Sequence, residues 1–237
     1  MKKVIVIILI LLVIAGGVTG FSFFKSYKER EAFFEIAYNT VYNESGNIES
    51  YTFKGTSTNL NTNEIMSYIE YYYDGENNKT LENYKYGEEG YIEYNELTEN
   101  SEIRYYLTYG DDVWFKEVEA LDEYGYSDNF DGQISDMSII LDAKSVKKLE
   151  DNIYELKYSK EYMDELSSED EIIENIAGKV YINNDYVVKA EIETVSSNAE
   201  IKRMNTKLVF ELTDINSTIV GIPDDIKNSA TEVSYED

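Results

Sequence analysis

The sequence contains no histidine and no cysteine, and Pro223 is its single proline. Nucleophilic sites built on Ser-His-Asp or Cys-His groups are therefore excluded, as are zinc sites with imidazole or thiolate ligands. The absence of cysteine also excludes disulfides and the lipid-modified cysteine of a lipoprotein. No other catalytic constellation is evident along the chain, so the sequence predicts that the protein is not an enzyme and needs no cofactor.

Basic residues are scarce as well, because 21 lysines and arginines stand against 47 aspartates and glutamates. The formal net charge of −26 excludes a nucleic-acid partner, since a run of phosphates must be neutralised by basic side chains. The chain is nevertheless not a disordered acidic tail, because 43 % of its residues are hydrophobic and 14 % are aromatic. Its 237 residues are enough for one sizeable domain with its own core.

The longest uncharged run lies near the start of the chain. Residues 4–24 follow Lys2 and Lys3, and the next charge is Lys25. As a helix this run would be about 31 Å long, which matches the roughly 30 Å hydrocarbon core of a bilayer. We therefore predict an N-terminal membrane anchor over residues 1–24, with a cleaved signal peptide as the alternative. A short tail before such a run favours a single-pass protein of the cell membrane with an extracytoplasmic C-terminal domain.

All 47 acidic side chains lie beyond residue 24. Anionic lipid headgroups and anionic wall polymers repel a domain of such charge. From the net charge alone, we expect the domain to stand off the membrane surface unless divalent cations bridge the two.

Two kinds of hydrophobic periodicity follow the predicted anchor. Residues 27–43 carry Phe33, Ala37 and Val41 at helical spacing, which predicts an amphipathic helix. From there to about residue 132, apolar and polar residues alternate between turn-forming Gly and Asp clusters, which predicts an antiparallel meander. Its expected strands occupy residues 51–56, 65–73, 90–97, 102–109 and 113–121.

The remainder of the chain predicts two short helices among further strands. One helix is expected around Met137 and Ile140, and the other after the capping-box pattern Ser168 to Glu171, ending at Gly178. The expected strands occupy residues 152–159, 179–182, 186–195 and 201–213. Because no linker interrupts the pattern, residues 25–230 are predicted to form one α+β domain and residues 231–237 a disordered acidic tail.

Three segments are similar to those of a known family: YGDDVWFK (109–116), GKVYINNDYVVKAEIETV (178–195) and KLVFELTDINSTIVGIPDDIKNSA (207–230). The last two match a family pattern of a final β-hairpin followed by an I-P-x-x-I terminus. Together with the order of elements, they resemble the LolA/LppX-like half-barrels of the lipoprotein-carrier superfamily, especially small lipoproteins of low-GC Gram-positive bacteria. The resemblance covers most of residues 27–230 and rests on packing and turn patterns. Unlike those lipoproteins this chain has no lipobox cysteine, so a protein anchor is expected instead.

The resemblance implies a curved antiparallel sheet, a half-barrel, with the N-terminal helix and short helices on its concave face and an apolar cavity between them. It also implies a membrane-anchored extracytoplasmic binding module for a lipid or acyl ligand or a lipidated partner protein. The apolar positions expected to line the cavity are Phe53, Ile69, Tyr105, Leu107, Val188, Ile192, Leu208 and Phe210. Ordinary core packing is the alternative role for each of them.

A second function remains open at this point. The chain holds 23 tyrosines, most of them in predicted strands, where amphipathic rings suit a half-exposed sheet. The protein is then a cell-surface structural or interaction protein whose acidic, tyrosine-rich sheet meets cations or wall polymers.

Overall fold

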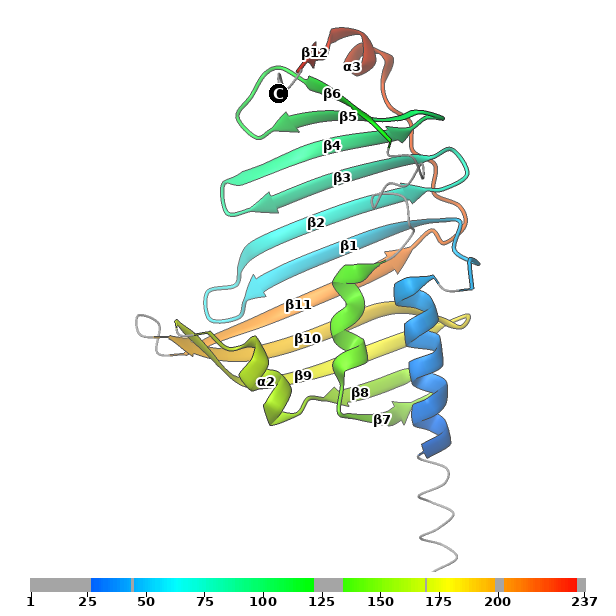
Figure 1. Cartoon of the computed structure of the whole chain (residues 1–237). Helices are drawn as coiled ribbons and strands as arrows, with labels where there is room; N and C mark the ends of the chain where they lie inside the picture. The colour runs from blue at the N-terminus through cyan, green and yellow to red at the C-terminus, as the bar shows by residue number, and fades with distance from the viewer. Residues whose placement is uncertain (1–26, 44, 122–133, 169, 199–202, 234–237) are drawn as a thin grey trace, which may run out of the picture.

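The computed structural model describes residues 27–43, 45–121, 134–168, 170–198 and 203–233. These residues form an α+β fold built on one open sheet of 12 strands, in the order β12-β6-β5-β4-β3-β2-β1-β11-β10-β9-β8-β7 (Figure 1). Neighbouring strands are antiparallel except β12, which is parallel to β6. The predicted α+β class and the mostly antiparallel sheet are thereby confirmed.

The strands are short at the two ends of the sheet and longest near its middle. Their bounds are β1 Ser50–Asn59, β2 Glu64–Asp74, β3 Lys79–Tyr86, β4 Glu89–Leu97, β5 Ser101–Thr108, β6 Phe115–Ala120, β7 Ser145–Glu150, β8 Ile153–Lys157, β9 Glu171–Asn183, β10 Tyr186–Asn198, β11 Met204–Thr213 and β12 Thr231–Glu232. The helices are residues 27–42, the 3₁₀ helix η2 (Ser135–Asp142), α2 (Lys160–Leu166) and α3 (Asp224–Ser229).

The N-terminal helix forms as its periodicity predicts. Phe33, Ala37 and Val41 recur every four residues and are fully buried against the sheet. Thr40 donates its hydroxyl hydrogen to the carbonyl oxygen of Ile36 and accepts the backbone N–H of Val187 at 3.1 Å, which ties the helix to β10. The helix is therefore part of the domain.

The main core lies between this helix, η2 and the sheet strands that they cover. Met137 and Ile140 of η2 are fully buried, which confirms the predicted short helix. They pack with side chains of β1 and of the strands from β11 to β8, and Figure 1 shows the helices in front of this half of the sheet. We call this sheet surface the helix side and the opposite surface the back side.

The C-terminal segment runs along the back side, beyond the end of β11. The carboxylate of Asp74, 1 % exposed, accepts the backbone N–H of Val220 at 2.9 Å. Further on, Ile222 and Ile226 pack against Tyr105 of β5 in a second, smaller cluster of buried residues. This segment therefore links the middle of the sheet to its β5–β6 end.

The helix predicted after Ser168 is wrong, because residues 171–183 form strand β9. The hydroxyl of Ser168 does accept the backbone N–H of Glu171 at 3.0 Å, as a capping box would require. Strand β9 nevertheless pairs with β10 from Glu171 to Asn183, and β-branched isoleucines suit that long ladder. Gly178 is not a helix stop: the Ile192 side chain lies over it, where a Cβ atom would come within 2.8 Å of Ile192 Cδ1.

The predicted disordered tail is wrong at its first two residues. Thr231 and Glu232 form β12 beside β6, and Thr231 donates its backbone N–H to the carbonyl oxygen of Trp114 at 2.8 Å. Residues 234–237 lie outside the described residues.

The predicted anchor over residues 1–24 also lies outside the described residues. Within the described ranges, every helix is too short or too polar to cross a bilayer.

Candidate binding surface

The sheet continues past the helices. Strands β2 to β6 extend the sheet beyond β1. Ile69, Tyr71 and Tyr73 of β2 still pack with the main core, whereas the helix side of β3 to β6 carries no helix among the described residues (Figure 1). Directly paired residues of antiparallel strands share one face, so the register identifies the side chains there. Starting from buried Phe53, the register runs through Tyr71, Glu82 and Glu93 to Tyr106.

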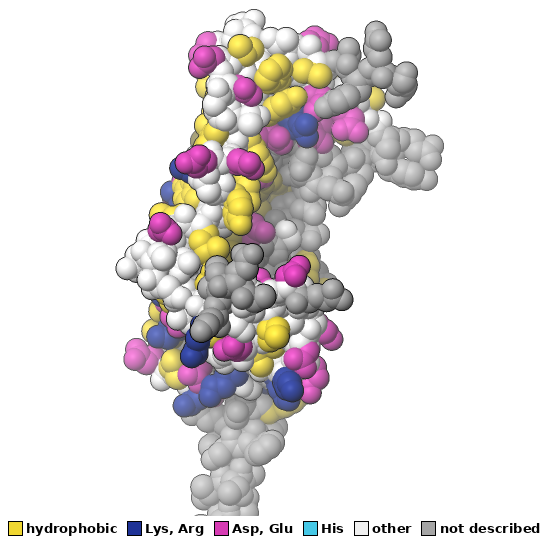
Figure 2. Space-filling model, turned by 90° about the vertical axis from the view of Figure 1, so that its left-hand side faces the viewer, with side chains coloured by type: hydrophobic (Ala, Val, Ile, Leu, Met, Phe, Trp, Pro, Cys, Tyr) yellow, Lys and Arg dark blue, Asp and Glu magenta, His cyan; other side chains and the backbone are white. Residues whose placement is uncertain are grey.

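Half-buried aromatic rings dominate this surface, which we call the tyrosine face. Its apolar members are Ile69, Tyr71, Tyr84, Tyr91, Tyr106 and Phe115. The ring centroids of Tyr84 and Tyr91 lie 5.5 Å apart, and those of Tyr106 and Phe115 lie 5.6 Å apart in a stacked pair. Figure 2 shows hydrophobic side chains in a band over the upper half of the molecule, with acidic side chains beside them. The rings thus form a ladder across five strands, β2 to β6.

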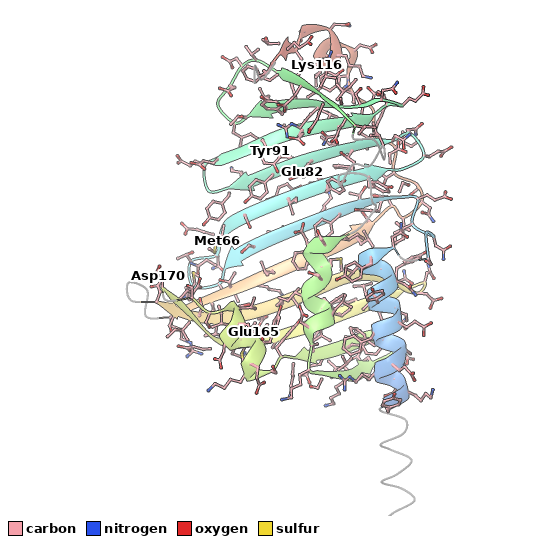
Figure 3. The ribbon with its side chains drawn as sticks, in the orientation of Figure 1. Met66, Glu82, Tyr91, Lys116, Glu165 and Asp170 are labelled. Atoms are coloured by element: carbon pink, nitrogen blue, oxygen red, sulfur yellow. The ribbon has the colours of Figure 1, made fainter. Side chains whose placement is uncertain are left out.

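Two glutamates lie opposite each other in the middle of the tyrosine face. Glu82 of β3 pairs directly with Glu93 of β4, and Tyr91 donates its hydroxyl hydrogen to Glu82 Oε1 at 2.5 Å (Figure 3). Burial raises the pKa of both carboxyl groups. The nearby carboxylate of Asp136 in η2 adds to the rise for Glu82, although the Tyr91 hydrogen bond opposes it.

Arg104 brings positive charge close to one of the two carboxylates, that of Glu93. Arg104 Nε lies 3.6 Å from Glu93 Oε2, but Arg104 Nη2 is closer to Glu117, at 2.6 Å. Asn95, 3 % exposed, donates Nδ2 to Glu93 Oε1 at 3.0 Å, and its Oδ1 is a buried acceptor without a partner. The face therefore combines apolar rings with carboxylates that are only partly compensated.

The glutamate pair gives a stability prediction. Replacing Glu82 with glutamine is expected to raise the free energy of unfolding at pH 7 by about 0.2–1 kcal/mol, because like charges directly opposite in a sheet repel. The sign of the pH dependence follows from the raised pKa. The carboxyl group of Glu82 holds its proton more tightly in the folded protein than in the unfolded chain. The cost of its negative charge to stability therefore disappears as the pH falls towards the ordinary glutamate pKa of about 4.3.

The measurement is thermal unfolding of the full chain between about pH 5 and pH 7, where most other carboxylates stay charged. The wild type should gain more stability at the acidic end than the Glu82→Gln variant does. Glu89→Gln is the matched control, because Glu89 is exposed at the start of β4 and carries the same charge. Equal pH dependence of stability in wild type and Glu82→Gln would refute the prediction that the Glu82 charge destabilises the folded protein.

The predicted cavity-lining residues do not share one surface. Phe53, Ile192 and Phe210 are buried in the main core on the helix side, where Ile69 and Leu208 pack against them half-buried. Their side chains belong to the main core beneath the helices. Tyr105 and Leu107 lie on the back side, because Tyr106 and Thr108 take the helix-side positions of β5. Val188 lies at a register shift between β10 and β9, half-buried near the β9–β10 turn.

A separate pocket of about 500 Å³ opens beside the β9–β10 turn. Val188 and Tyr186 line it together with Leu212, Thr213 and Asp214, and asparagine side chains supply much of the rest. Polar and apolar side chains therefore line this pocket together, and Val188 is the member of the predicted lining set that reaches it. In the described part of the chain, no group of three or more acidic side chains is arranged to hold a metal ion.

The sequence does not predict which tyrosines and glutamates share the tyrosine face. Glu82 and Tyr84 belong to β3, a strand that the periodicity does not predict. The segment KTLENYKY mixes lysine, glutamate and asparagine with tyrosine, since both of its faces are half-exposed. A pairing of Glu82 with Glu93 also depends on the turn between the strands, where Gly87 has a φ of 60°. The turn-forming segment Gly-Glu-Glu-Gly at residues 87–90 is the sequence signal that indicates a hairpin at this place.

No protein-family model and no curated protein matches this chain.

Proposed function

We propose that this protein is a membrane-tethered, extracytoplasmic, non-enzymatic binding module that holds an apolar ligand on its tyrosine face. The ligand class is a lipid or acyl chain, either free or attached to a partner protein. The observation that carries the proposal is the ladder of half-buried rings across β2 to β6. A surface of half-buried aromatic rings with a few polar groups among them is typical of interaction and ligand sites.

Core packing supports this location for the ligand. Phe53, Ile192 and Phe210 are buried among other core side chains between helices and sheet, so an acyl chain bound there would have to displace packed side chains. Over β3 and β4 the rings of Tyr84 and Tyr91 are only half-buried. An open antiparallel sheet with a helix on one side also suits the half-barrel architecture of the LolA/LppX-like domains. The tether in this proposal is the uncharged run at residues 4–24.

The test compares what the purified full chain retains. Wild-type protein, Tyr84→Ala and Tyr38→Ala are purified from the same membranes, and bound acyl compounds are measured by mass spectrometry. Tyr38 is the matched control, because it is a tyrosine of the N-terminal helix, 44 % exposed and not part of the tyrosine face. All three variants keep the same N-terminal run, so lipid held around that run cancels in the comparison.

The wild type and Tyr38→Ala are expected to retain a defined acyl compound that Tyr84→Ala loses by about tenfold. Loss of one buried aromatic contact is enough for that change, since 1.4 kcal/mol corresponds to a factor of ten. Equal retention by all three variants would count against the tyrosine face as the site. If none retains an acyl compound but wild type binds purified wall polymer, the surface-interaction function takes precedence, because half-exposed tyrosines also stack on sugar rings.

A further inference from the structure

Charge is unevenly divided between the two sides of strands β3 to β6. Their register separates helix-side residues from back-side residues, starting from the Glu82–Glu93 pair on the helix side. The charged residues on the helix side are Glu82, Glu89, Glu93, Glu102, Arg104, Glu117 and Glu119. Those on the back side are Lys79, Lys85, Glu96 and Lys116. In these strands the tyrosine face therefore carries six carboxylates and one guanidinium, whereas the back side carries three ammonium groups and one carboxylate.

The one guanidinium of this face is shared between two carboxylates. Arg104 Nη2 lies 2.6 Å from Glu117, and Arg104 Nε lies 3.6 Å from Glu93. Glu82 instead accepts a hydrogen bond from the neutral hydroxyl of Tyr91, and the carboxylate of Asp136 adds further negative charge near it. The Glu82–Glu93 pair therefore keeps a net negative charge.

The glutamate pair lies between a polar pair and an aromatic pair. Three successive residue pairs of β3 and β4 follow one another on this face: Thr80 with Asn95, Glu82 with Glu93, and Tyr84 with Tyr91. Figure 3 shows Glu82 and Tyr91 on these two neighbouring strands. Successive pairs are about 7 Å apart along a strand, so one small amphiphile can reach all three.

Asn95 supplies an unpaired acceptor beside the glutamate pair. Its side chain is on the same face, and Nδ2 donates to Glu93 Oε1 at 3.0 Å and to Thr80 Oγ1 at 3.2 Å. Asn95 is only 3 % exposed, and its Oδ1 atom has no hydrogen-bond partner. A buried acceptor without a donor is costly, so this position favours a ligand with an N–H or O–H group. Carboxylates and the faces of aromatic rings favour a positive charge as well.

We propose that the ligand of the tyrosine face carries a primary ammonium group, which binds at the Glu82–Glu93 pair while its acyl chain lies along Tyr84 and Tyr91. The proposal rests on the proposed function and adds the charge of the ligand to it. An ammonium group has three N–H donors and no acceptor, which matches a cluster of acceptors. The same face already holds one cation over a ring, because Arg104 Cζ lies 5.1 Å from the centroid of Tyr106.

The cost of the glutamate pair supports the same conclusion. Burial raises the pKa of the Glu82 and Glu93 carboxyl groups, so their charges destabilise the folded protein. Charges kept at a cost to stability are typical of functional sites. A bound ammonium group between the two carboxylates offsets their repulsion.

The test uses three probes that share one alkyl chain: decylammonium, decyltrimethylammonium and decanol. Full-length protein in phosphatidylcholine nanodiscs is titrated with each probe by calorimetry, and the heat measured with empty nanodiscs is subtracted. Wild type is expected to bind decylammonium about tenfold more tightly than decanol, the effect of one added hydrogen bond to a charged group. Decyltrimethylammonium should fall between them, because it has the charge but no N–H donor.

Glu82→Gln is expected to weaken decylammonium binding about tenfold and to leave decanol binding unchanged. Glu76→Gln is the matched control, because Glu76 is exposed in the β2–β3 turn and the change in net charge is the same. It should leave the affinity for all three probes unchanged.

Two results would overturn the charge of the ligand while the proposed function stands: equal affinity of wild type for decanol and decylammonium, or undiminished decylammonium binding in Glu82→Gln. Equal affinity for decylammonium and decyltrimethylammonium would overturn the primary ammonium group, since N–H donors would then contribute nothing. Absence of binding for all three probes would refute the proposed function as well.

Discussion

Replacing Phe33 with alanine is expected to lower the free energy of unfolding by about 3–5 kcal/mol, the usual cost of removing a buried phenylalanine side chain. Phe33 is fully buried and packs edge-on against Phe34 at 5.3 Å and against Tyr154 of β8 at 5.1 Å. The alanine would leave a cavity between the N-terminal helix and the sheet, where the Phe33 ring now packs. Because domains are stable by only about 5–15 kcal/mol, this single change removes a large fraction of the total.

The same variant tests whether the sheet unfolds as one unit. The single tryptophan, Trp114, packs near Tyr94 in the small cluster at the far end of the sheet. Denaturation of the full chain is followed by circular dichroism and by Trp114 fluorescence. Both midpoints should shift together in Phe33→Ala. Tyr38→Ala, on the exposed side of the same helix, should change stability by less than about 1 kcal/mol. An unshifted Trp114 transition would show two independent units.

Replacing Asp74 with alanine is expected to cost about 1.5–3 kcal/mol per charge-assisted hydrogen bond lost. The buried carboxylate accepts the N–H of Val220 and also the backbone and side-chain N–H groups of Asn77. Losing it frees the C-terminal segment at Val220, between β11 and the cluster around Ile226. Amide hydrogen exchange at Val220 should therefore accelerate strongly.

Glu76→Ala is the control for Asp74→Ala, because Glu76 lies in the same turn and is exposed. It should change stability by no more than about 0.5 kcal/mol. Asp74→Asn should fall between the two, since an amide oxygen still accepts the Val220 N–H without the charge. Slow exchange at Val220 in Asp74→Ala would mean that Ile222 and Ile226 hold the segment without help.

The sequence predicts those parts of the fold in which one face is buried and the other exposed. The N-terminal helix follows from the four-residue spacing of Phe33, Ala37 and Val41. The strand predicted at 186–195 falls within β10, which alternates buried Ala190 and Ile192 with exposed or half-exposed neighbours. In both places one face of the element is buried in the core, so apolar residues recur at the spacing of a helix or a strand.

Prediction fails where that contrast is absent or where a local signal competes with pairing. Strand β3 is half-exposed on both faces, so its residues show no clear alternation. At Ser168 the capping bond forms, but the ladder with β10 decides that a strand follows. The predicted lining residues do not share one face because facing depends on register: in β5 the helix-side position belongs to Tyr106, so Leu107 lies on the back side.

The tyrosine face is beyond prediction for the same reason. Glu82 and Glu93 are eleven positions apart in the chain, and only the β3–β4 register places them opposite each other. Their raised pKa values arise from burial, which no sequence pattern expresses.

Site-specific photocrosslinking tests the central claim, that the tyrosine face holds an apolar ligand. A photoreactive phenylalanine analogue replaces Tyr84 on the face, or Tyr38 on the N-terminal helix, in the full chain within its own membrane. After irradiation, mass spectrometry of the protein should show an acyl adduct at position 84 and none at position 38. No adduct at position 84, or equal adducts at both positions, would contradict the claim.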